Sequence, residues 1–578
     1  MIKTIQRRPV ADTSELPANL HPILKNIYAN RGIESAEQLE QSAQAMHNPK
    51  QLKGLEQACA VIFDAIKAKK RIIIVGDFDA DGATSTALMM SGLQLLGSHN
   101  HDFLVPNRFD FGYGLTPQIS QIAVEQMGAE VIVTVDNGIS CLAGVEMAKA
   151  LGCQVIVTDH HLPGNQLPDA DAIVNPNQPG CPFPSKSIAG VGVAFYLMLA
   201  LRQSMRQANW FAQQGLAEPN MAQLLDLVAL GTVADVVSLD HNNRILVAQG
   251  LKRIRAGATR PGIVALIEVA GKNQRQLVAS DFGFGLGPRI NAAGRLDDMG
   301  LGIKCLLETD LNVARVMAKE LDELNQTRRE IEAGMQHEAM QVLDTLSFEQ
   351  QQMPMALALY RPDWHQGVIG IVAGRLKEKF HRPTIVFAKG RDDASDSEIK
   401  GSARSIPGLH IRDLLEHIDS QHPGLITKFG GHAMAAGLSI KEADFERFQQ
   451  HFYHYAEQWL ESEMLNNIIL SDGELEQQLL TLEFAHLLRE SGPWGQNFPE
   501  PVFDNHFRLI QQRIVGDKHL KMLVELNGVS IDAIAFNVDL QQWPNHRCEW
   551  VHLAYKLDVN EFRGKQSVQL LVNYLQSV

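Results

Sequence analysis

The stretch that decides the fold is Ile72-Ile73-Ile74-Val75-Gly76-Asp77-Phe78-Asp79-Ala80-Asp81-Gly82. Its run of β-branched apolar residues predicts a strand that is buried on both faces of a sheet, and three aspartates follow at alternate positions. Carboxylates this close together repel one another and raise each other's pKa unless a cation neutralises them. The pattern therefore predicts a metal site where this strand ends.

The same arrangement occurs twice more along the chain. Val131-Ile132-Val133-Thr134-Val135 leads into Asp136, and Val155-Ile156-Val157-Thr158 leads into Asp159-His160-His161. Strands that alternate with helical segments form a doubly wound parallel sheet, whose carboxyl ends line one crevice. We therefore expect these groups to converge. Carboxylates with an imidazole suit Mg²⁺ or Mn²⁺, and the presence of His160 favours Mn²⁺.

Two other interpretations of the first aspartate cluster exist. The pattern D-x-D-x-D-G also opens an EF-hand calcium loop, but the twelfth position, which requires a glutamate, is Leu88. A strand-like run rather than a helix also precedes it. Asp and Gly are common in ordinary turns, which would explain one such junction. Three junctions between a strand and acidic residues favour a functional site.

Four motifs resemble those of the DHH phosphoesterase superfamily: Asp79 with Asp81, then Asp136, then Asp159-His160-His161, then Asp235 within residues 231–237 (GTVADVV). Further segments resemble, in family order, the RecJ family of bacterial single-strand-specific 5′ exonucleases. These segments are residues 288–295 (PRINAAGR), 364–370 (WHQGVIG), 400–405 (KGSARS) and 429–437 (FGGHAMAAG). The resemblance covers nearly the whole chain. The tripeptide DHH alone is weak, but the ordered series of motifs is specific.

The resemblance implies a centre with two divalent cations, Mn²⁺ or Mg²⁺. In the family pattern Asp79 and Asp81 each hold one ion, Asp136 bridges both, and His160 and Asp235 complete the second site. Two ions about 4 Å apart activate a water on one side of a phosphodiester and neutralise the leaving oxygen on the other. Hydrolysis then needs no protein nucleophile.

Three neighbouring residues have predicted supporting roles. His161 would contact the scissile phosphate as a charge stabiliser or a proton donor. Asp159 would orient a ligand from behind through a hydrogen bond. Asp77 lies on the same alternating face as the two aspartates after it, but the family pattern emphasises the later two, so we assign it a supporting place.

An exonuclease must also hold its strand. Arg is the expected phosphate ligand because its guanidinium binds phosphate through two hydrogen bonds. A glycine-rich turn lets phosphate approach bare backbone, as we expect at Gly431-His432. A single Arg outside a motif more often forms a surface salt bridge, so we assign Arg residues to phosphate binding because of the motifs in which they lie. The candidate nucleic-acid-binding residues are Arg108, Arg289, Asn291, Arg295, Ser402, Arg404, Gly431, His432, Lys518, Lys521, Tyr555, Phe562 and Arg563.

Periodicity and length, 578 residues, predict a multidomain α/β protein. Helical spacing from Leu311 to Leu346 predicts a long connecting helix. Five short strand-like runs near the end predict an OB-fold or a β-sandwich, and the resemblance favours the OB-fold. The predicted segments are an N-terminal helical cap (1–55), a DHH catalytic domain with a doubly wound parallel sheet (56–305), the connecting helix (306–346), a DHHA1 α/β domain (347–460), a helical linker (461–503) and a C-terminal OB-fold β-barrel (504–578).

The composition is that of an ordinary globular protein, with 45% hydrophobic and 20% charged residues. The first residues contain no apolar signal core, and the longest apolar run, Val191 to Leu201, is too short to span a membrane. The six cysteines form no C-x-x-C pair, which fits buried thiols in a reducing compartment. We therefore expect a cytoplasmic protein without a membrane partner.

The net charge of −14 contrasts with the basic surface that nucleic-acid-binding proteins usually show. The distribution of charge matters more than its sum, since residues 504–578 contain eight basic and eight acidic residues. Part of the acidic excess is the predicted metal-binding set, whose charge bound cations would cancel. An acidic total therefore does not exclude a locally positive channel.

The leading hypothesis is a processive 5′-to-3′ exonuclease that releases mononucleotides from single-stranded DNA in repair and recombination. The polarity, and a single-stranded-DNA-binding protein and a helicase as partners, come from the resemblance; we expect a monomer. The alternative is a small-substrate DHH hydrolase acting on pyrophosphate, cyclic dinucleotides or short oligonucleotides, which needs only two α/β lobes. A metal-free binding protein of this fold would lack ligands, whereas every expected Asp and His is present here.

Overall fold

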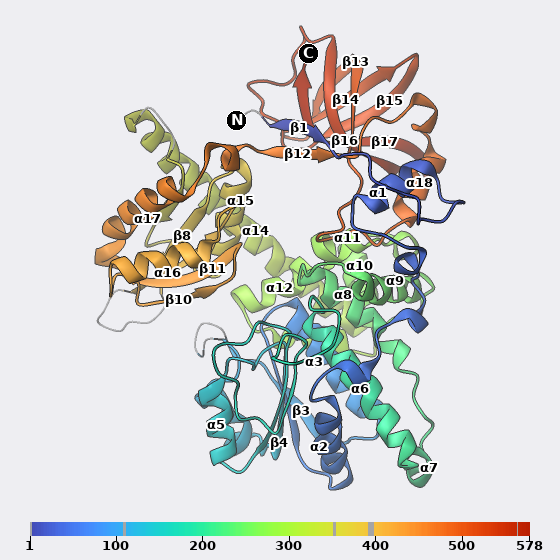
Figure 1. Cartoon of the computed structure of the whole chain (residues 1–578), viewed down its shortest axis with the longest axis vertical. Coiled ribbons are helices and arrows are strands. Elements are labelled where there is room, and N and C mark those ends of the chain that lie inside the picture. Colours follow the sequence, from blue (N-terminus) through green and yellow to red (C-terminus); the bar gives the residue numbers. More distant parts are fainter. Residues whose placement is uncertain (1–2, 108–110, 112, 351–353, 391–397, 563) are drawn as a thin grey trace. The chain divides into compact units, whose positions relative to one another are not determined.

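The structure of the chain is a computed structural model (Figure 1), and it describes residues 3–107, 111, 113–350, 354–390, 398–562 and 564–578, without the side chains of residues 342, 344–350, 462 and 562. The chain forms two compact units. The smaller unit comprises Met1–Gln6 and Gln326–Leu470, and the larger comprises Arg7–Asn325 and Ser471–Val578. Each unit has its own sheets and its own apolar core.

The larger unit contains a parallel sheet with the strand order β3-β2-β4-β5-β6. Alternate residues of the first central strand enter opposite cores: Ile72 and Ile74 pack on one face, and Ile73 and Val75 on the other. Both faces are therefore covered, which explains the continuous apolar runs. The strands are β2 (Ile72–Gly76), β3 (His101–Leu104), β4 (Val131–Val135), β5 (Gln154–Thr158) and β6 (Ala172–Val174).

After β2 the chain first adds β3 on one side of β2 and then crosses to add β4 on the other side, so the order of the strands changes direction between β2 and β4. In a doubly wound sheet the connections on either side of such a point leave toward opposite faces, and a crevice opens at the carboxyl ends of the two strands. Asp77 follows β2 and Asp136 follows β4, so both lie at this crevice. The parallel sheet thereby brings together residues that are far apart in the sequence.

Helices cover the sheet, and the buried α3 contacts both α6 and α8. Small residues along α3, including Ala83, Ala87 and Gly92, let these helices approach closely. The helices are α1 (Pro22–Ala29), α2 (Leu55–Lys67), α3 (Ala80–Leu95), α4 (Pro117–Gln121), α5 (Leu142–Ala150), α6 (Gly190–Gln207), α7 (Trp210–Gln214), α8 (Leu225–Ala234), α9 (His241–Arg255), α10 (Pro261–Val269), α11 (Ala279–Asp281), the π-helical turn η7 (Phe282–Leu286), α12 (Gly287–Leu296) and α13 (Gly300–Leu307).

The C-terminal strands of the larger unit close a five-stranded barrel in the order β13-β14-β15-β17-β16. Alternate residues of β14, among them Leu520, Met522 and Val524, fill its interior. Helix α18 (Leu482–Glu490) packs against β16 and β17. The barrel strands are β13 (Phe503–Val515), β14 (His519–Leu526), β15 (Val529–Ala535), β16 (Trp550–Phe562) and β17 (Lys565–Ser577).

The smaller unit contains a mixed sheet with the order β10-β11-β9-β8-β7, in which only the pair of β7 and β8 is parallel. Its strands are β7 (Leu357–Tyr360), β8 (Thr384–Lys389), β9 (Glu398–Arg404), β10 (Lys428–Gly431) and β11 (Ala435–Lys441). Its helices are α15 (Ile369–Phe380), α16 (Ile411–Gln421) and α17 (Phe445–Trp459). The boundary between the units falls within α14 (Leu311–Gln350), between Asn325 and Gln326.

The predicted fold class is confirmed: a doubly wound parallel-sheet domain, a long helix, a second α/β domain and a closed β-barrel. Two segments differ from the prediction. Residues 1–55 include the strand β1 (Thr4–Arg7), and residues 461–503 include its partner strand β12 (Ile468–Ser471), so neither segment is purely helical. Such short strands are too brief for a period of two to stand out. The six domain limits stay predictions.

No helix within the described part of the chain has both the length and the apolar character that crossing a membrane requires.

Candidate active site

The turn after β2 is held by side chains that cap α3. Asp79 Oδ1 accepts a hydrogen bond from Gly82 N at 3.0 Å, and Asn291 Oδ1 accepts one from Ala80 N at 2.8 Å. Both bonds satisfy amides that lack a partner inside the helix. The oxygen of Asn291 thus fixes the start of the helix that carries Asp81, and the predicted binding of nucleic acid by this residue stays a prediction.

Asp81 lies in the first turn of α3 and is completely buried. Its Oδ2 accepts a hydrogen bond from Gly190 N at 2.6 Å, and its Oδ1 accepts one from Val191 N at 2.9 Å. These amides begin α6, whose positive end favours a carboxylate. Burial, and then the charge of Asp235, nevertheless raise the pKa of Asp81 to about 7. The pocket therefore needs additional positive charge to keep this carboxylate ionised near neutral pH.

Asp136 follows β4 in the left-handed backbone region, with φ 61°. That conformation is uncommon for a residue other than glycine. Asn137 stabilises the turn by donating hydrogen bonds to carbonyls of β2 and β4 at 3.1 and 2.8 Å. Gly190 leaves room, since a Cβ atom there would lie 2.8 Å from Asp136 Oδ1. Burial, followed by the charge of Asp81, raises the pKa of Asp136 well above its usual range.

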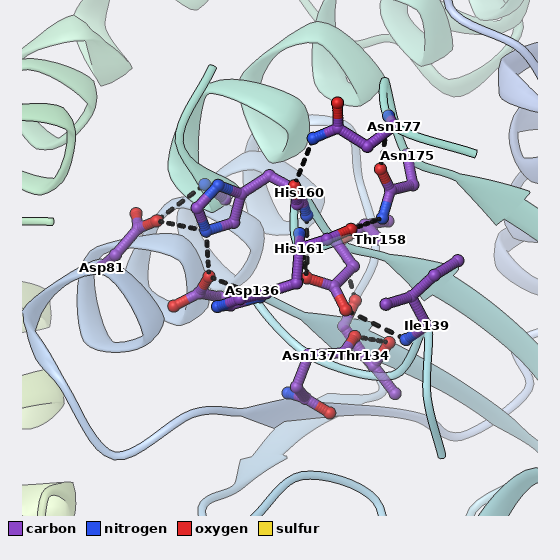
Figure 2. A network of polar contacts seen from close by, with 12 residues as sticks. Asp81, Thr134, Asp136, Asn137, Ile139, Thr158, His160, His161, Asn175 and Asn177 are labelled. Carbon is purple, nitrogen blue, oxygen red and sulfur yellow. Dashed lines mark hydrogen bonds and ion pairs between the residues drawn. The ribbon is translucent and has the colours of Figure 1, made fainter. Parts of the chain in front are cut away.

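His160 lies among these carboxylates, as Figure 2 shows for Asp81 and Asp136. Its Nε2 lies 3.0 Å from Asp136 Oδ1, 3.5 Å from Asp235 Oδ2 and 3.9 Å from Asp81 Oδ2. Within the described part of the chain, three of these atoms are buried and make no hydrogen bond: His160 Nε2, Asp136 Oδ1 and Asp235 Oδ2. Buried polar atoms without such bonds are costly, so this donor set fits a bound cation.

The candidate ligand atoms form overlapping groups, and within each group they lie within 4.8 Å of one another. Asp136 joins two of these groups, which fits its predicted bridging place. Oxygen-rich groups with one or two imidazoles suit Mn²⁺ or Mg²⁺. The groups are Asp77 with Asp79 and Asp136, Asp81 with His160 and Asp235, and Asp136 with His160 and His161. In this geometry Asp77 is a ligand candidate equal to Asp79 rather than a supporting residue.

Asp159 holds His161. His161 Nδ1 lies 2.7 Å from Asp159 Oδ1, and Asp159 Oδ2 accepts a hydrogen bond from Ile139 N at 2.9 Å. Burial opposes the charge on both side chains, but their contact raises the pKa of His161 to about 9 and keeps the pKa of Asp159 below its usual range. Asp159 therefore orients His161, which is also a member of one of the candidate ligand groups.

Tyr113 is not among the residues that the motifs predict. Its hydroxyl donates a hydrogen bond to Asp136 O at 3.1 Å and lies 3.4 Å from His161 Nδ1. Its ring meets the rings of Phe78 and His161 edge to face, with centroids 6.0 Å apart in each case. Tyr113 lies in the loop after β3, far from any strand end that carries a motif, so only the tertiary structure reveals it.

Two asparagines after β6 anchor the DHH turn (Figure 2). Asn175 Nδ2 donates a hydrogen bond to His161 O at 2.9 Å, and Asn177 Nδ2 donates one to His160 O at 2.6 Å. Both follow a strand closely, as the motif aspartates do. The same pattern in the sequence therefore contained a signal that could have identified them.

A groove of about 1400 Å³ lies in the larger unit, next to the segment that carries Asp235. It is lined by residues on both sides of Asp235, Val233 and Val236, and by residues of the barrel strands β16 and β17. Burial, followed by the positive charge of Arg489, lowers the pKa of Arg255. The charged residues that line the groove are five basic ones, Lys252, Arg255, Lys272, Arg489 and Lys556, and five acidic ones, Glu40, Asp281, Glu490, Glu500 and Asp558.

Arg289 was predicted to bind nucleic acid, but it makes structural contacts. Its Nη1 donates a hydrogen bond to Gly285 O at 2.6 Å, and its Nη2 lies 2.8 Å from Asp322 Oδ1. These bonds join α12, η7 and α14, and the residue is only 8% exposed. These contacts give Arg289 a structural role, and its predicted binding of nucleic acid stays a prediction. Arg295, half-buried near the end of α12, stays a prediction.

Ser402 and Arg404 lie side by side on β9 of the smaller unit. Arg404 Nη1 donates hydrogen bonds to Ser402 Oγ at 3.1 Å and Ala403 O at 2.9 Å, both neutral oxygens. A Cβ atom at Gly370, in the first turn of α15, would lie 2.9 Å from Arg404 Nη2. Burial lowers the pKa of Arg404. A half-buried guanidinium beside a helix N-terminus is suited to an anion.

The turn between β10 and β11 lies next to this pair, because Ala435 is the partner of Arg404 across the strands. Gly431 has φ 145°, and a Cβ atom there would lie 2.5 Å from Ala435 O, so the turn itself requires glycine. His432 is exposed. Both residues stay predicted nucleic-acid contacts.

Tyr555 was predicted to contact nucleic acid, but it is fully buried in the barrel and donates a hydrogen bond to Asn505 Oδ1 at 2.7 Å. It belongs to the core because alternation along β16 places it inside with Val551 and Leu553. Lys521 lies 3.3 Å from Asp532 across the barrel surface.

Lys518, in the turn between β13 and β14, is exposed and stays a prediction. Phe562 ends β16. Its side chain, and the predicted Arg108 and Arg563, lie outside what the structure describes.

Comparison with known proteins fits this fold and site. Residues 71–232 match the DHH family, N-terminal domain, residues 353–458 match the DHHA1 domain, and residues 471–574 match the RecJ OB domain. The fold and the cluster of carboxylates and imidazoles thus define a protein of the DHH class. The chain is 57% identical over 571 residues to the single-stranded-DNA-specific exonuclease RecJ of Escherichia coli strain K12, covering 98% of each chain. The chain belongs to the RecJ family.

Further relatives and solved structures that the chain resembles are also RecJ proteins. The chain is 51% identical to RecJ of Haemophilus influenzae over 582 residues, covering 100% of each. Among solved structures it resembles RecJ from Thermus thermophilus in complex with Mn²⁺, with a TM-score of 0.79, 29% identity, and coverage of 100% of this chain and 79% of that one. The Mg²⁺ complex from the same organism gives a TM-score of 0.73.

Proposed function

We propose that this protein is an exonuclease that hydrolyses single-stranded DNA at the centre formed after β2, β4 and β5. The observation that carries the proposal is the set of three overlapping ligand groups at the carboxyl ends of these strands, two of which share Asp136. The relatives named single-stranded-DNA-specific exonuclease support this substrate.

The residues present fit two divalent cations. The group with Asp77 and Asp79 would hold one ion, and the group with Asp81 and Asp235 the other, with Asp136 between them. Structures of a relative with Mn²⁺ and with Mg²⁺ support these two metals. When bound, such ions lower the pKa of a water molecule and neutralise charge on the phosphate.

His161 is placed to act on the phosphate. Because Nδ1 is engaged by Asp159, Nε2 is the ring nitrogen left to face a substrate. A pKa of about 9 keeps the ring protonated at neutral pH, so His161 can donate a hydrogen bond or a proton to the leaving oxygen. Tyr113 packs beside the ring and limits its rotation.

The pair of Ser402 and Arg404 is the proposed site for the 5′-terminal phosphate. A terminal phosphate carries more charge than an internal one, and a half-buried guanidinium without a carboxylate partner among its described hydrogen bonds favours it. Recognition of this end would give the 5′-to-3′ polarity. Processivity and mononucleotide products follow from the family pattern.

We further propose that the protein acts in the cytoplasm as a monomer, in DNA repair and recombination, with a single-stranded-DNA-binding protein and a helicase as partners. These assignments come from the family resemblance.

The test is digestion of oligonucleotides of increasing length, labelled at either end, with Mn²⁺. The proposal predicts mononucleotides released progressively from the 5′ end of single strands, and little cleavage of the same strand in a blunt duplex. A small-substrate hydrolase would instead cleave dinucleotides best and lose activity with length. Equal cleavage of single and double strands would contradict the proposal.

A further inference from the structure

Phe284 is exposed to an unusual degree. Its residue surface is 83% exposed, whereas Phe282, two positions earlier, is completely buried. A single exposed apolar side chain is ordinary on a protein surface, so the place of this ring in the molecule, and not its exposure alone, is what suggests a contact. No packing role within the described chain accounts for the position of this ring.

The backbone that carries Phe284 is rigidly held. Phe284 lies in the π-helical turn η7, a rare element that is frequent at functional sites. Arg289 fastens this turn by donating a hydrogen bond to Gly285 O at 2.6 Å, while the same guanidinium pairs with Asp322. Phe282 anchors the other side of the turn in the core. The exposed ring is therefore carried by a backbone segment that is held on both sides by the core and by a hydrogen bond.

Phe284 lines the groove next to the metal-ligand candidate Asp235. A Cβ atom at the neighbouring Gly283 would lie 3.6 Å from Val233 Cγ1, so η7 packs against the end of α8 just before Asp235. Val236, directly after Asp235, lines the same groove, is 62% exposed and has φ 65°. A β-branched residue in that conformation is strained, and such strain is often found where function requires it. Both apolar side chains line the groove near the segment that carries Asp235, and we refer to them as the apolar ledge.

Basic and acidic residues line the groove around this ledge in equal number, and two of its lysines are paired with carboxylates, Lys272 with Asp281 and Lys556 with Glu500. Arg255 and Arg489 both line the groove. Arg255 donates a hydrogen bond to Leu277 O at 2.7 Å, and Arg489 donates one to Gln276 O at 3.2 Å, so both bond to neutral carbonyls. An aromatic face combined with guanidinium groups is the arrangement by which proteins hold single strands, stacking bases and neutralising phosphates.

We propose that Phe284 is a base-stacking platform that sets the position of the strand as it enters the metal centre. This inference rests on the proposed function and adds to it a named residue for substrate registration. A base stacked on a ring held by η7 would fix the distance from that nucleotide to the ligands around Asp235. Stacking suits every base, so the platform would be indifferent to sequence. The two-residue ledge is too small to act as a protein docking surface of ordinary size.

The test combines protein variants with altered substrates. Phe284→Ala removes the ring, Phe284→Leu keeps an apolar side chain without an aromatic face, and Phe284→Trp restores a face. Val316→Ala, at a 68% exposed position of α14, is the matched control for loss of an exposed apolar side chain. Each protein is assayed with Mn²⁺ on thymidine oligonucleotides in which a single abasic site is moved stepwise from the 5′ end.

For the wild type we expect one abasic position to lower kcat/KM by roughly 5- to 150-fold, the range typical of one base–aromatic stack. Phe284→Ala and Phe284→Leu should show a similar loss on the intact oligonucleotide, and the abasic site at that position should then cost nothing further. Phe284→Trp should recover the wild-type pattern, and Val316→Ala should leave it unchanged.

The inference is overturned if Phe284→Ala keeps kcat/KM within twofold of wild type, or if its abasic profile matches the wild-type profile. It is also overturned if Phe284→Leu performs as well as Phe284→Trp, since apolar contact alone would then suffice. A wild-type protein that fails to digest the intact single strand would instead contradict the proposed function itself, so the two failures are distinguishable.

Discussion

His161 Nδ1 and Asp159 Oδ1 lie 2.7 Å apart, and the same carboxylate oxygen accepts hydrogen bonds from the backbone amides of His160 and His161 at 2.7 and 3.1 Å. Asp159 therefore fixes both the turn and the ring. The two histidines of the DHH sequence therefore have different surroundings. His160 faces the carboxylates of the ligand groups, and His161 is oriented by Asp159, the first residue of the motif.

His161→Ala should lower kcat by about 10² to 10⁴-fold while leaving Mn²⁺ affinity within a few-fold of wild type, because the ring assists proton transfer rather than metal binding. Asp159→Asn should have a smaller effect in the same direction. Single-turnover kinetics and calorimetric Mn²⁺ titration measure the two quantities. His410→Ala, at an exposed position, is the control. A large loss of Mn²⁺ affinity in His161→Ala would instead make His161 a metal ligand.

Asp81→Asn, Asp136→Asn and His160→Ala should each abolish cleavage, since each removes a ligand from the proposed centre. Folding should survive, and circular dichroism would confirm it. Mn²⁺ at about 100 times its Kd should stabilise the wild type by about 2.7 kcal/mol, which raises Tm. The three variants should show a smaller rise. Cleavage above a tenth of wild type in two of them, at saturating Mn²⁺, is incompatible with the assignment.

Arg404→Ala should reduce the preference for a 5′-phosphorylated end over a 5′-hydroxyl end. A charge-assisted hydrogen bond to a terminal phosphate is worth about 1.5 to 3 kcal/mol, and the hydroxyl substrate does not gain it. Ser402→Ala should do the same more weakly, and exposed Arg412→Ala should change nothing. Measuring kcat/KM for both ends across a salt series checks this. Equal losses on both substrates would show that Arg404 contacts internal phosphates only.

Tyr555→Phe should lower the free energy of unfolding by about 0.5 to 1.5 kcal/mol through loss of one buried hydrogen bond to Asn505, with little effect on DNA affinity. Chemical denaturation and fluorescence anisotropy with a single-stranded oligonucleotide measure the two effects. Lys518→Ala, at the exposed turn, is the contrasting variant: it should weaken binding without changing stability. A selective loss of DNA affinity in Tyr555→Phe would return Tyr555 to the binding surface.

Asp504 should make the larger unit sensitive to acid. Burial favours its neutral form, but hydrogen bonds from Arg7, Ser471 and His552 hold its pKa below the usual range. A carboxylate with a lowered pKa stabilises the fold above its unfolded pKa of about 3.9 and loses that contribution as the pH falls through the folded value. Asp504→Asn should therefore lower Tm at pH 7. Its Tm should fall less than that of the wild type when the pH is lowered below about 4. Asp517→Asn, at an exposed turn, should follow the wild-type pH dependence.

The sequence alone identified the strand ends that carry Asp79, Asp81, Asp136 and the DHH turn. It did so because a buried parallel strand requires a continuous apolar run, and because such a sheet gathers its carboxyl ends at one crevice. Five alternating runs also predicted a C-terminal β domain, and the family resemblance favoured the closed barrel over a β-sandwich. Alternation even contained the signal that Tyr555 faces inward, since it shares its parity with Val551 and Leu553.

Only the tertiary structure decided which charged and aromatic side chains are available to a ligand. Arg289 lies in a motif, yet its guanidinium forms a salt bridge with Asp322 from another helix. Phe282 and Phe284 read alike in the sequence, but the π-helical turn buries one and exposes the other. Tyr113 reaches His161 from a loop. Periodicity reports the local direction of a side chain, whereas its partners and its exposure depend on segments that only folding brings together.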